Sequence, residues 1–135
     1  MNFDVPYGIT VRLRGTTIAG ARERVTEALK GEGFGILTEI DVQATLEKKL
    51  GVKIEPYLIL GACNPKLAHE ALQKEPAIGL LLPCNVVVAQ DGADVVVSAA
   101  SPRAMFQIVE GVDGIAAVAT AAEERLRRAI GSLAA

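Results

Sequence analysis

The stretch NVVVAQDGADVVVSA, residues 85–99, decides the fold that we predict for this chain. Two valine-rich runs, 85–90 and 94–99, flank Asp91 and Gly92, a pair that commonly closes a tight turn between antiparallel strands. We therefore predict a β-hairpin. Both runs carry valine on both faces, whereas a sheet with one face in water alternates apolar and polar residues. We expect the second face to be covered by extra helices of the chain, by a second copy of the chain, or by an apolar small molecule in a pocket.

Alternation of apolar and polar residues predicts further strands upstream of the hairpin. In the second of them the alternation places Ile36 and Ile40 on one face, and Glu39 and Asp41 on the other. With the hairpin, these strands make a sheet of five. The upstream strands are predicted over residues 9–14, 34–41 and 57–62.

Apolar residues at helical spacing predict helices in the segments between and after the strands. The last helix is the most regular, with Asp113 as its expected N-cap and an apolar stripe from Ile115 to Leu133. Its Glu123–Arg127 and Glu124–Arg128 pairs, four residues apart, are predicted to lie on the exposed side. The other helices are predicted from Thr17 to Gly31 or Gly33, over 42–50 behind Asp41, over 65–75 behind Asn64, and in a short segment opened by Ser101 and Pro102.

Length and composition limit the classes of protein to which the chain can belong. Its 135 residues predict one domain, 1–135, and half of them are apolar, as in a packed globular protein. The net charge is -2 and aromatic residues make up 4%, which argues against nucleic acid as a partner. The N-terminus lacks a signal-peptide pattern and no run is apolar enough to span a membrane, so we expect a cytoplasmic protein with no membrane partner.

The two cysteines are the residues most able to carry chemistry. Cys63 directly precedes the predicted N-cap of the 65–75 helix, where helix amides would lower the pKa of a thiol and make it reactive. Cys84 lies at the start of the next strand, so the two thiols could meet at neighbouring strand ends and share a soft metal or cycle through a disulfide. The alternative for each is a buried, inert cysteine that packs as a small apolar residue.

Three other polar residues have simpler explanations. His69 is predicted to point away from the apolar face of its helix, toward water, which makes it a poor metal ligand or general base. Glu39 and Asp41 lie on one side of their strand and could form a carboxylate pair for acid–base catalysis. Asp41 has a structural explanation as a helix cap, and Glu39 could line a solvated edge or the mouth of a cleft.

Three phrases in this order carry a family resemblance: GFGILTEIDV at 33–42, PYLILGACNP at 56–65 and IGLLLPCNVVV at 78–88. The chain resembles the bacterial and archaeal family called "domain of unknown function 302". The resemblance implies an α+β fold of TATA-binding-protein-like β-α-β4-α type, in which two long helices pack on a curved antiparallel five-stranded sheet. It also implies a homodimer. To this architecture the residue pattern adds short extra helices, inserted before strand 3 and between strands 3 and 4. The resemblance supplies no catalytic role for the positions that match the family phrases, namely Glu39, Asp41, Cys63, Asn64, Pro65, Pro83, Cys84 and Asn85.

These observations lead to three hypotheses about function. The first is a homodimeric binding module for a small ligand, a soft metal or a sulfur species. The second is a thiol-redox enzyme with Cys63 as nucleophile and Cys84 as resolving thiol, and the third is a structural subunit that binds another protein. No residue is assigned as catalytic and no cofactor is named. The hypothetical ligand site consists of Cys63, Asn64, Cys84, Asn85 and Glu39.

Overall fold

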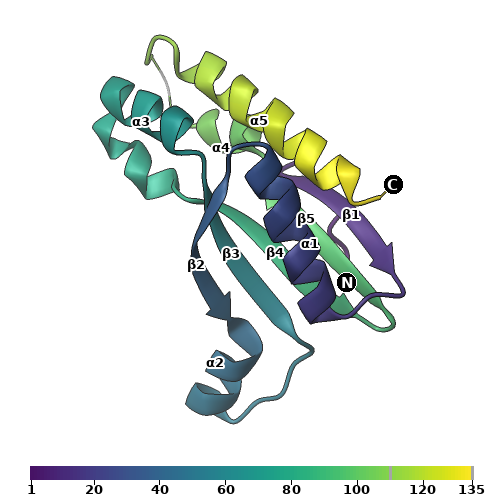
Figure 1. Cartoon of the computed structure of the whole chain (residues 1–135). Helices are drawn as coiled ribbons and strands as arrows, with labels where there is room; N and C mark the ends of the chain where they lie inside the picture. Colours follow the sequence, from purple (N-terminus) through teal and green to yellow (C-terminus); the bar gives the residue numbers. More distant parts are fainter. Residues whose placement is uncertain (110, 135) are drawn as a thin grey trace.

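A computed structural model describes residues 1–109 and 111–134 and shows an α+β fold. Within these residues, five strands form one antiparallel sheet in the order β1-β5-β4-β3-β2 (Figure 1). The predicted architecture is confirmed, including the short helices before β3 and between β3 and β4. The strands are β1 (Gly8–Arg14), β2 (Gly35–Asp41), β3 (Tyr57–Cys63), β4 (Cys84–Asp91) and β5 (Asp94–Ala100).

The predicted hairpin is β4 and β5, and its turn lies where Asp91 pairs with Asp94. Gly92 adopts a φ of 61° there, a left-handed conformation that favours glycine. The second face of the hairpin is partly buried, with Ala89, Val96 and Ser98 buried and Asn85 exposed. Of the three covers that we considered for it, extra helices of the chain are not the one that the structure shows. Residues 1–7 cross this face, over Val96 and near Tyr57, while α-helices cover the opposite face.

Two long helices, α1 (Ile18–Gly31) and α5 (Ile115–Ser132), cover the first face of the sheet (Figure 1). Helix α1 begins after Thr17, close to the predicted start, and Thr17 caps it, since its side chain accepts a hydrogen bond from the Gly20 amide at 2.9 Å. The predicted Asp113 cap of α5 is wrong. Gly114 takes the N-cap position with a φ of 82° and no side-chain cap. The predicted stripe of α5 is confirmed, and its buried members are Ile115, Ala119, Ala122, Leu126, Ala129 and Leu133.

The predicted Glu123–Arg127 pair of α5 forms at 2.7 Å, but two other parts of the ion-pair prediction are wrong. Glu123 is only 2% exposed, because α5 turns this side chain toward the start of a short helix and buries it there. Arg128 bonds Glu32 across to the end of α1 at 3.1 Å, a contact between helices that helical spacing cannot reveal.

Helix α2 (Val42–Leu50) lies at the far end of β2 and β3, away from α1 and α5 (Figure 1). Asp41 caps it, as predicted, by accepting from the Ala44 amide at 2.9 Å, and Gly51 ends it with a φ of 68°. The predicted alternation in β2 fails. A bulge between Ile36 and Thr38 shifts the register, so Ile36 packs on the helix-bearing face with the main core while Ile40 is opposite Ile59 on the other face.

A second, smaller hydrophobic core lies beside the end of the sheet. It joins the first half of α5 to α3 (Pro65–Lys74), the 3-10 helix η1 (Pro76–Leu81) and α4 (Pro102–Phe106). The sequence predicted α3 and α4 but not η1. Among residues 1–109 and 111–134, no helix has both the length and the apolar character that crossing a bilayer requires.

Candidate functional site

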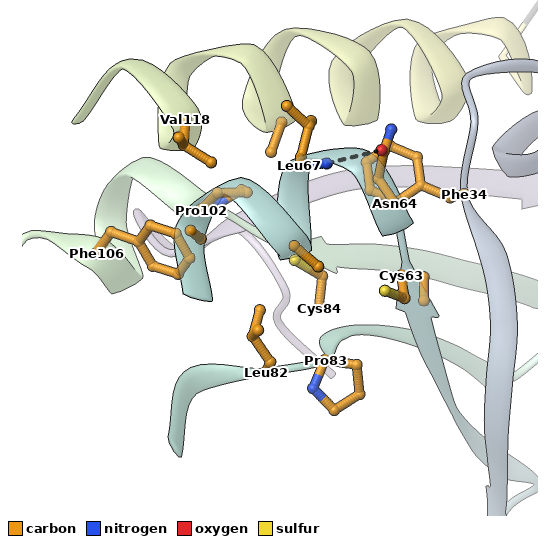
Figure 2. Close-up of a pocket in the computed structure, with 14 residues that line it drawn as sticks. Phe34, Cys63, Asn64, Leu67, Leu82, Pro83, Cys84, Pro102, Phe106 and Val118 are labelled. Atoms are coloured by element: carbon orange, nitrogen blue, oxygen red, sulfur yellow. Dashed lines mark hydrogen bonds between the residues drawn. The ribbon is translucent and has the colours of Figure 1, made fainter. Parts of the chain in front are cut away.

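A small cavity lies where the main core meets the second core, at the adjoining ends of β3 and β4 (Figure 2). Its volume is about 30 Å³, which is enough for roughly one water-sized group. Cys63 and Cys84 both line it, as does Asn64. The apolar part of the wall includes Phe34, Leu67, Leu82, Pro83, Pro102 and Phe106.

The strand register places the two cysteines at adjoining strand ends. Cys84 is directly opposite Ala62 in the β3–β4 ladder, and Cys63 is the next residue along β3. Neither cysteine is in a disulfide. Both cysteines therefore line one cavity at the adjoining ends of β3 and β4.

Asn64 has the structural role that the sequence predicted. Its side-chain oxygen accepts from the Leu67 amide at 3.2 Å, which caps α3, and its side-chain nitrogen donates to the Glu32 carbonyl at 3.5 Å. A Cβ on Gly33 would approach this nitrogen to 3.0 Å. Asn64 is thus held between the end of α1 and the start of α3, and it fixes the backbone beside Cys63.

The electrostatic prediction for the thiols is wrong. Burial raises the pKa of Cys63, whereas we expected the α3 N-terminus to lower it. Burial also raises the pKa of Cys84, to about 11, and a negative charge on Cys63 adds to that shift. The reason is that the cavity wall is almost entirely apolar, so the cost of desolvating a thiolate exceeds the benefit from the helix. Both thiols are therefore protonated at neutral pH.

Two members of the hypothetical ligand site lie elsewhere. Asn85 follows Cys84 in β4, so its side chain is exposed on the opposite face of the sheet, where it lines a different pocket. Glu39 lies on β2 and accepts from Arg22 of α1 at 2.6 and 2.8 Å. Hydrogen bonds from Arg22 hold the pKa of Glu39 below its usual range, which makes it a weak base.

His69 is exposed on α3, as predicted, and does not line the cavity. Within the described residues, no three His, Cys, Asp or Glu side chains are grouped in a way that could hold a metal ion. Asp41 is committed to capping α2. Of the residues in the hypothetical ligand site, the structure therefore places Cys63, Cys84 and Asn64 at one cavity.

The sequence reasoning missed the wall of the cavity. Pro102 and Phe106 of α4 close it from one side, and Val118 of α5 closes it from above in Figure 2. Pro83 was part of a family phrase, and its ring lies against Gly61, where any Cβ would meet both Pro83 and the Thr38 side chain. Pro102, Phe106 and Val118 come from helices far along the chain from Cys63, so no local pattern groups them with it.

Comparisons with known proteins agree with this fold. The family model described as "Domain of unknown function DUF302" matches residues 9–133. A crystal structure of an uncharacterized conserved DUF302 protein from Bacillus stearothermophilus is 29% identical, covers 94% of this chain and 98% of that chain, and superposes with a TM-score of 0.85. Among curated proteins, none matches this chain. Because the family model spans nearly the whole chain, the resemblance predicted from three phrases is confirmed and the chain belongs to the DUF302 family.

Proposed function

We propose that this protein is a small binding module that holds one soft, thiophilic metal ion between Cys63 and Cys84. The observation that carries the proposal is that both free thiols line one apolar cavity of about 30 Å³. An organic substrate does not fit in that volume, since ligand pockets commonly measure about 300–1,000 Å³. A single ion is the right size for it.

The chemistry of the cavity favours a soft ion such as Cu(I). Thiolates are the ligands that soft metals prefer, whereas a structural zinc site needs about four protein ligands. Binding requires the two thiols to lose their protons, and the metal charge replaces the protons in neutralising the thiolates. Since burial raises the pKa of both thiols, the affinity for the ion rises with pH.

A thiol-redox enzyme, the second hypothesis, fits the electrostatics less well. The nucleophile of such an enzyme is a thiolate near neutral pH, and burial keeps both thiols protonated.

We place the binding function in the cytoplasm, where cellular reductants keep thiols of this kind reduced.

The proposal is tested by anaerobic titration of the reduced protein with Cu(I) against a chromophoric competitor. We expect one ion per chain, and an affinity that falls at least a hundredfold in Cys63→Ser and in Cys84→Ser. Asn85→Ala is the matched control, because Asn85 adjoins Cys84 in sequence but lies on the opposite face. Equal Cu(I) affinity in the wild type and the double serine variant would refute the proposal and favour a purely structural subunit.

We further propose that the module is a homodimer formed through the projecting arm of β2 and α2 and the loop to β3. Five large apolar residues of this arm are exposed to solvent. Contiguous exposed apolar patches commonly mark protein–protein interfaces. β2 is also an edge strand with unpaired backbone groups. A native mass of one 14.2 kDa chain at micromolar concentration would refute this assembly. The exposed residues are Leu37 (65%), Ile40 (48%), Leu50 (69%), Val52 (44%) and Ile54 (36%).

A further inference from the structure

A second, larger cavity lies on the sheet face opposite α1 and α5, between the sheet and residues 1–7. Its volume is about 310 Å³, at the lower end of the range for small-molecule sites. We propose that it binds a small, uncharged molecule that carries a flat ring and one amide-like or hydroxyl hydrogen-bonding group. This site is separate from the thiol cavity and does not depend on the function proposed for it.

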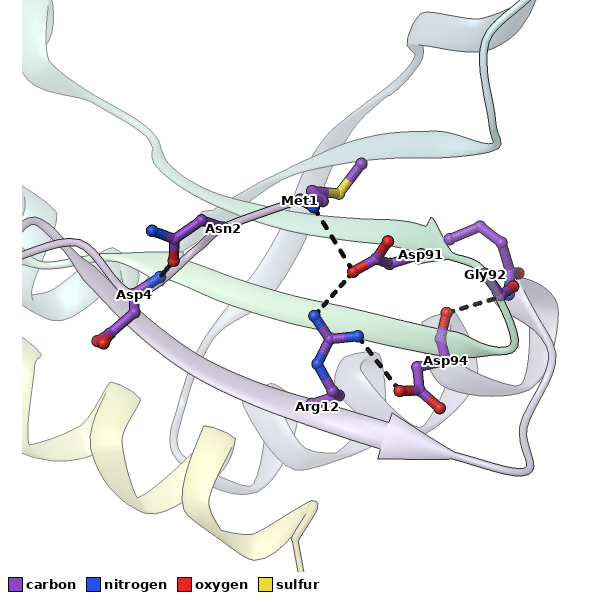
Figure 3. A network of polar contacts seen from close by, with 8 residues as sticks. Met1, Asn2, Asp4, Arg12, Asp91, Gly92 and Asp94 are labelled. Carbon is purple, nitrogen blue, oxygen red and sulfur yellow. Dashed lines mark hydrogen bonds and ion pairs between the residues drawn. The ribbon is translucent and has the colours of Figure 1, made fainter.

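The cavity has a rim that several contacts hold in place. The Thr10 hydroxyl donates to the Phe3 carbonyl at 2.9 Å, and the Ser101 amide donates to the Tyr7 carbonyl at 2.8 Å. The amino group of Met1 lies 3.9 Å from the Asp91 carboxylate (Figure 3). The first seven residues are thus fixed at both ends across the sheet, so the space beneath them is pre-formed.

The walls favour a flat apolar ring. Phe3 from the rim and Tyr57 from β3 face each other with ring centroids 6.5 Å apart and planes tilted by 35°. Aromatic side chains in such an arrangement contribute favourable ring contacts in addition to the area they bury. The floor includes Val87 of β4 and Ala100 of β5, and the Ser98 hydroxyl of the same face is already hydrogen-bonded to Thr10 at 2.8 Å. Met105 adds an adaptable side chain at one end.

The charge of the site argues for a neutral occupant. No Asp, Glu, Lys, Arg or His is among the described residues that line it, so an ion would lose hydration without gaining a partner. The nearby Arg12 is already paired with Asp91 at 2.8 Å and with Asp94 at 3.2 Å, and these contacts lie toward the hairpin turn (Figure 3).

Two polar groups can orient the occupant. The exposed amide of Asn85 both donates and accepts hydrogen bonds. The hydroxyl of Tyr57 stays protonated at neutral pH, because burial raises its pKa, and so it remains a donor. An amide or hydroxyl on the ring matches both groups.

Methyl NMR titration of the wild-type protein with benzamide tests the proposal, with benzoate and benzylamine as charged probes of similar shape. We expect benzamide to shift the methyl signals of Val87, Ala100 and Met105 in a saturable way, and both charged probes to bind at least tenfold more weakly. Absence of saturable benzamide shifts, or equal binding of benzoate, would overturn the proposal.

Variants then locate the bound probe. Val87→Trp fills the cavity with an indole and should weaken benzamide at least tenfold, while Leu80→Trp, a similar change at an exposed apolar residue outside the cavity, should not. Asn85→Ala alters an exposed residue that the fold does not need, and it should weaken benzamide several-fold. Unchanged benzamide binding in Asn85→Ala and Val87→Trp would refute the site.

Discussion

Replacing Glu123 by glutamine should destabilise the protein by about 2 kcal/mol, because this buried carboxylate holds α4 against α5. One carboxylate oxygen accepts from the Ser101 hydroxyl at 2.6 Å and from the Arg103 amide at 3.2 Å. The other accepts from two nitrogens of Arg127 at 3.0 and 2.7 Å. The network matters for the thiol cavity, since α4 supplies Pro102 and Phe106 to its wall.

The magnitude follows from these contacts. In Glu123→Gln the amide oxygen can still accept from Ser101 and Arg103, but bonds to a neutral acceptor are worth about half of the roughly 1.5–3 kcal/mol of charge-assisted ones. The amide nitrogen then faces Arg127, whose ion pair is lost. That pair contributes less than about 1 kcal/mol, because Arg127 is 59% exposed. The sum is about 2 kcal/mol, or roughly 8 °C in Tm for a chain of this size.

The pH dependence gives a second measure of the same contact. Burial opposes the ionisation of Glu123, but hydrogen bonds from Ser101, the Arg103 amide and Arg127 outweigh burial and lower its pKa. A lowered pKa in the folded state stabilises the protein above the ordinary glutamate value of about 4.3, and this stabilisation is lost as the pH falls. The difference between the wild type and Glu123→Gln should therefore be largest at pH 7 and shrink toward pH 3.

Urea unfolding followed by circular dichroism at pH 7 and at pH 3 measures both effects. Glu124→Gln is the matched control, since the neighbouring carboxylate is exposed and the same change there should cost less than about 0.5 kcal/mol. The reasoning is refuted if the free energies of unfolding of Glu123→Gln and the wild type differ by less than about 0.5 kcal/mol at pH 7. Surface substitutions commonly cause differences of about that size.

Three further outcomes follow from the described contacts. Iodoacetamide should modify Cys63 and Cys84 slowly at pH 7 and increasingly fast toward pH 11, because burial raises the pKa of both thiols, that of Cys84 to about 11; fast modification at pH 7, detected by mass spectrometry, would contradict this. Leu60→Ala should cost about 2–5 kcal/mol in urea unfolding, because the side chain is fully buried in the main core, and a loss below about 1 kcal/mol would show that the site collapses around the gap. Arg22→Ala should change stability by less than about 1 kcal/mol, since its ion pair with Glu39 is largely exposed, and a larger loss by the same assay would mean that the pair is structural.

Local signals were sufficient for most of the secondary structure. Thr17, Asp41 and Asn64 begin helices at the predicted positions, because capping depends on a side chain and the amide two or three residues away. Gly114 displaced the predicted Asp113 cap, because the approach of the chain to α5 needs a left-handed residue directly before the helix. The bulge after Ile36 reversed the facing of half of β2, since one extra residue changes the side of every residue that follows it.

Amino-acid pattern alone determined the sheet, the long helices and the family, because these depend on periodicity, turn chemistry and short phrases that neighbouring residues carry. Tertiary structure decided the properties of the site. It placed Asn85 on the face opposite Cys84, buried Glu123 under α4, and enclosed both thiols in an apolar wall that raises their pKa. Solvent exposure and the electrostatic environment of a group depend on residues from distant parts of the chain, so no local pattern can specify them.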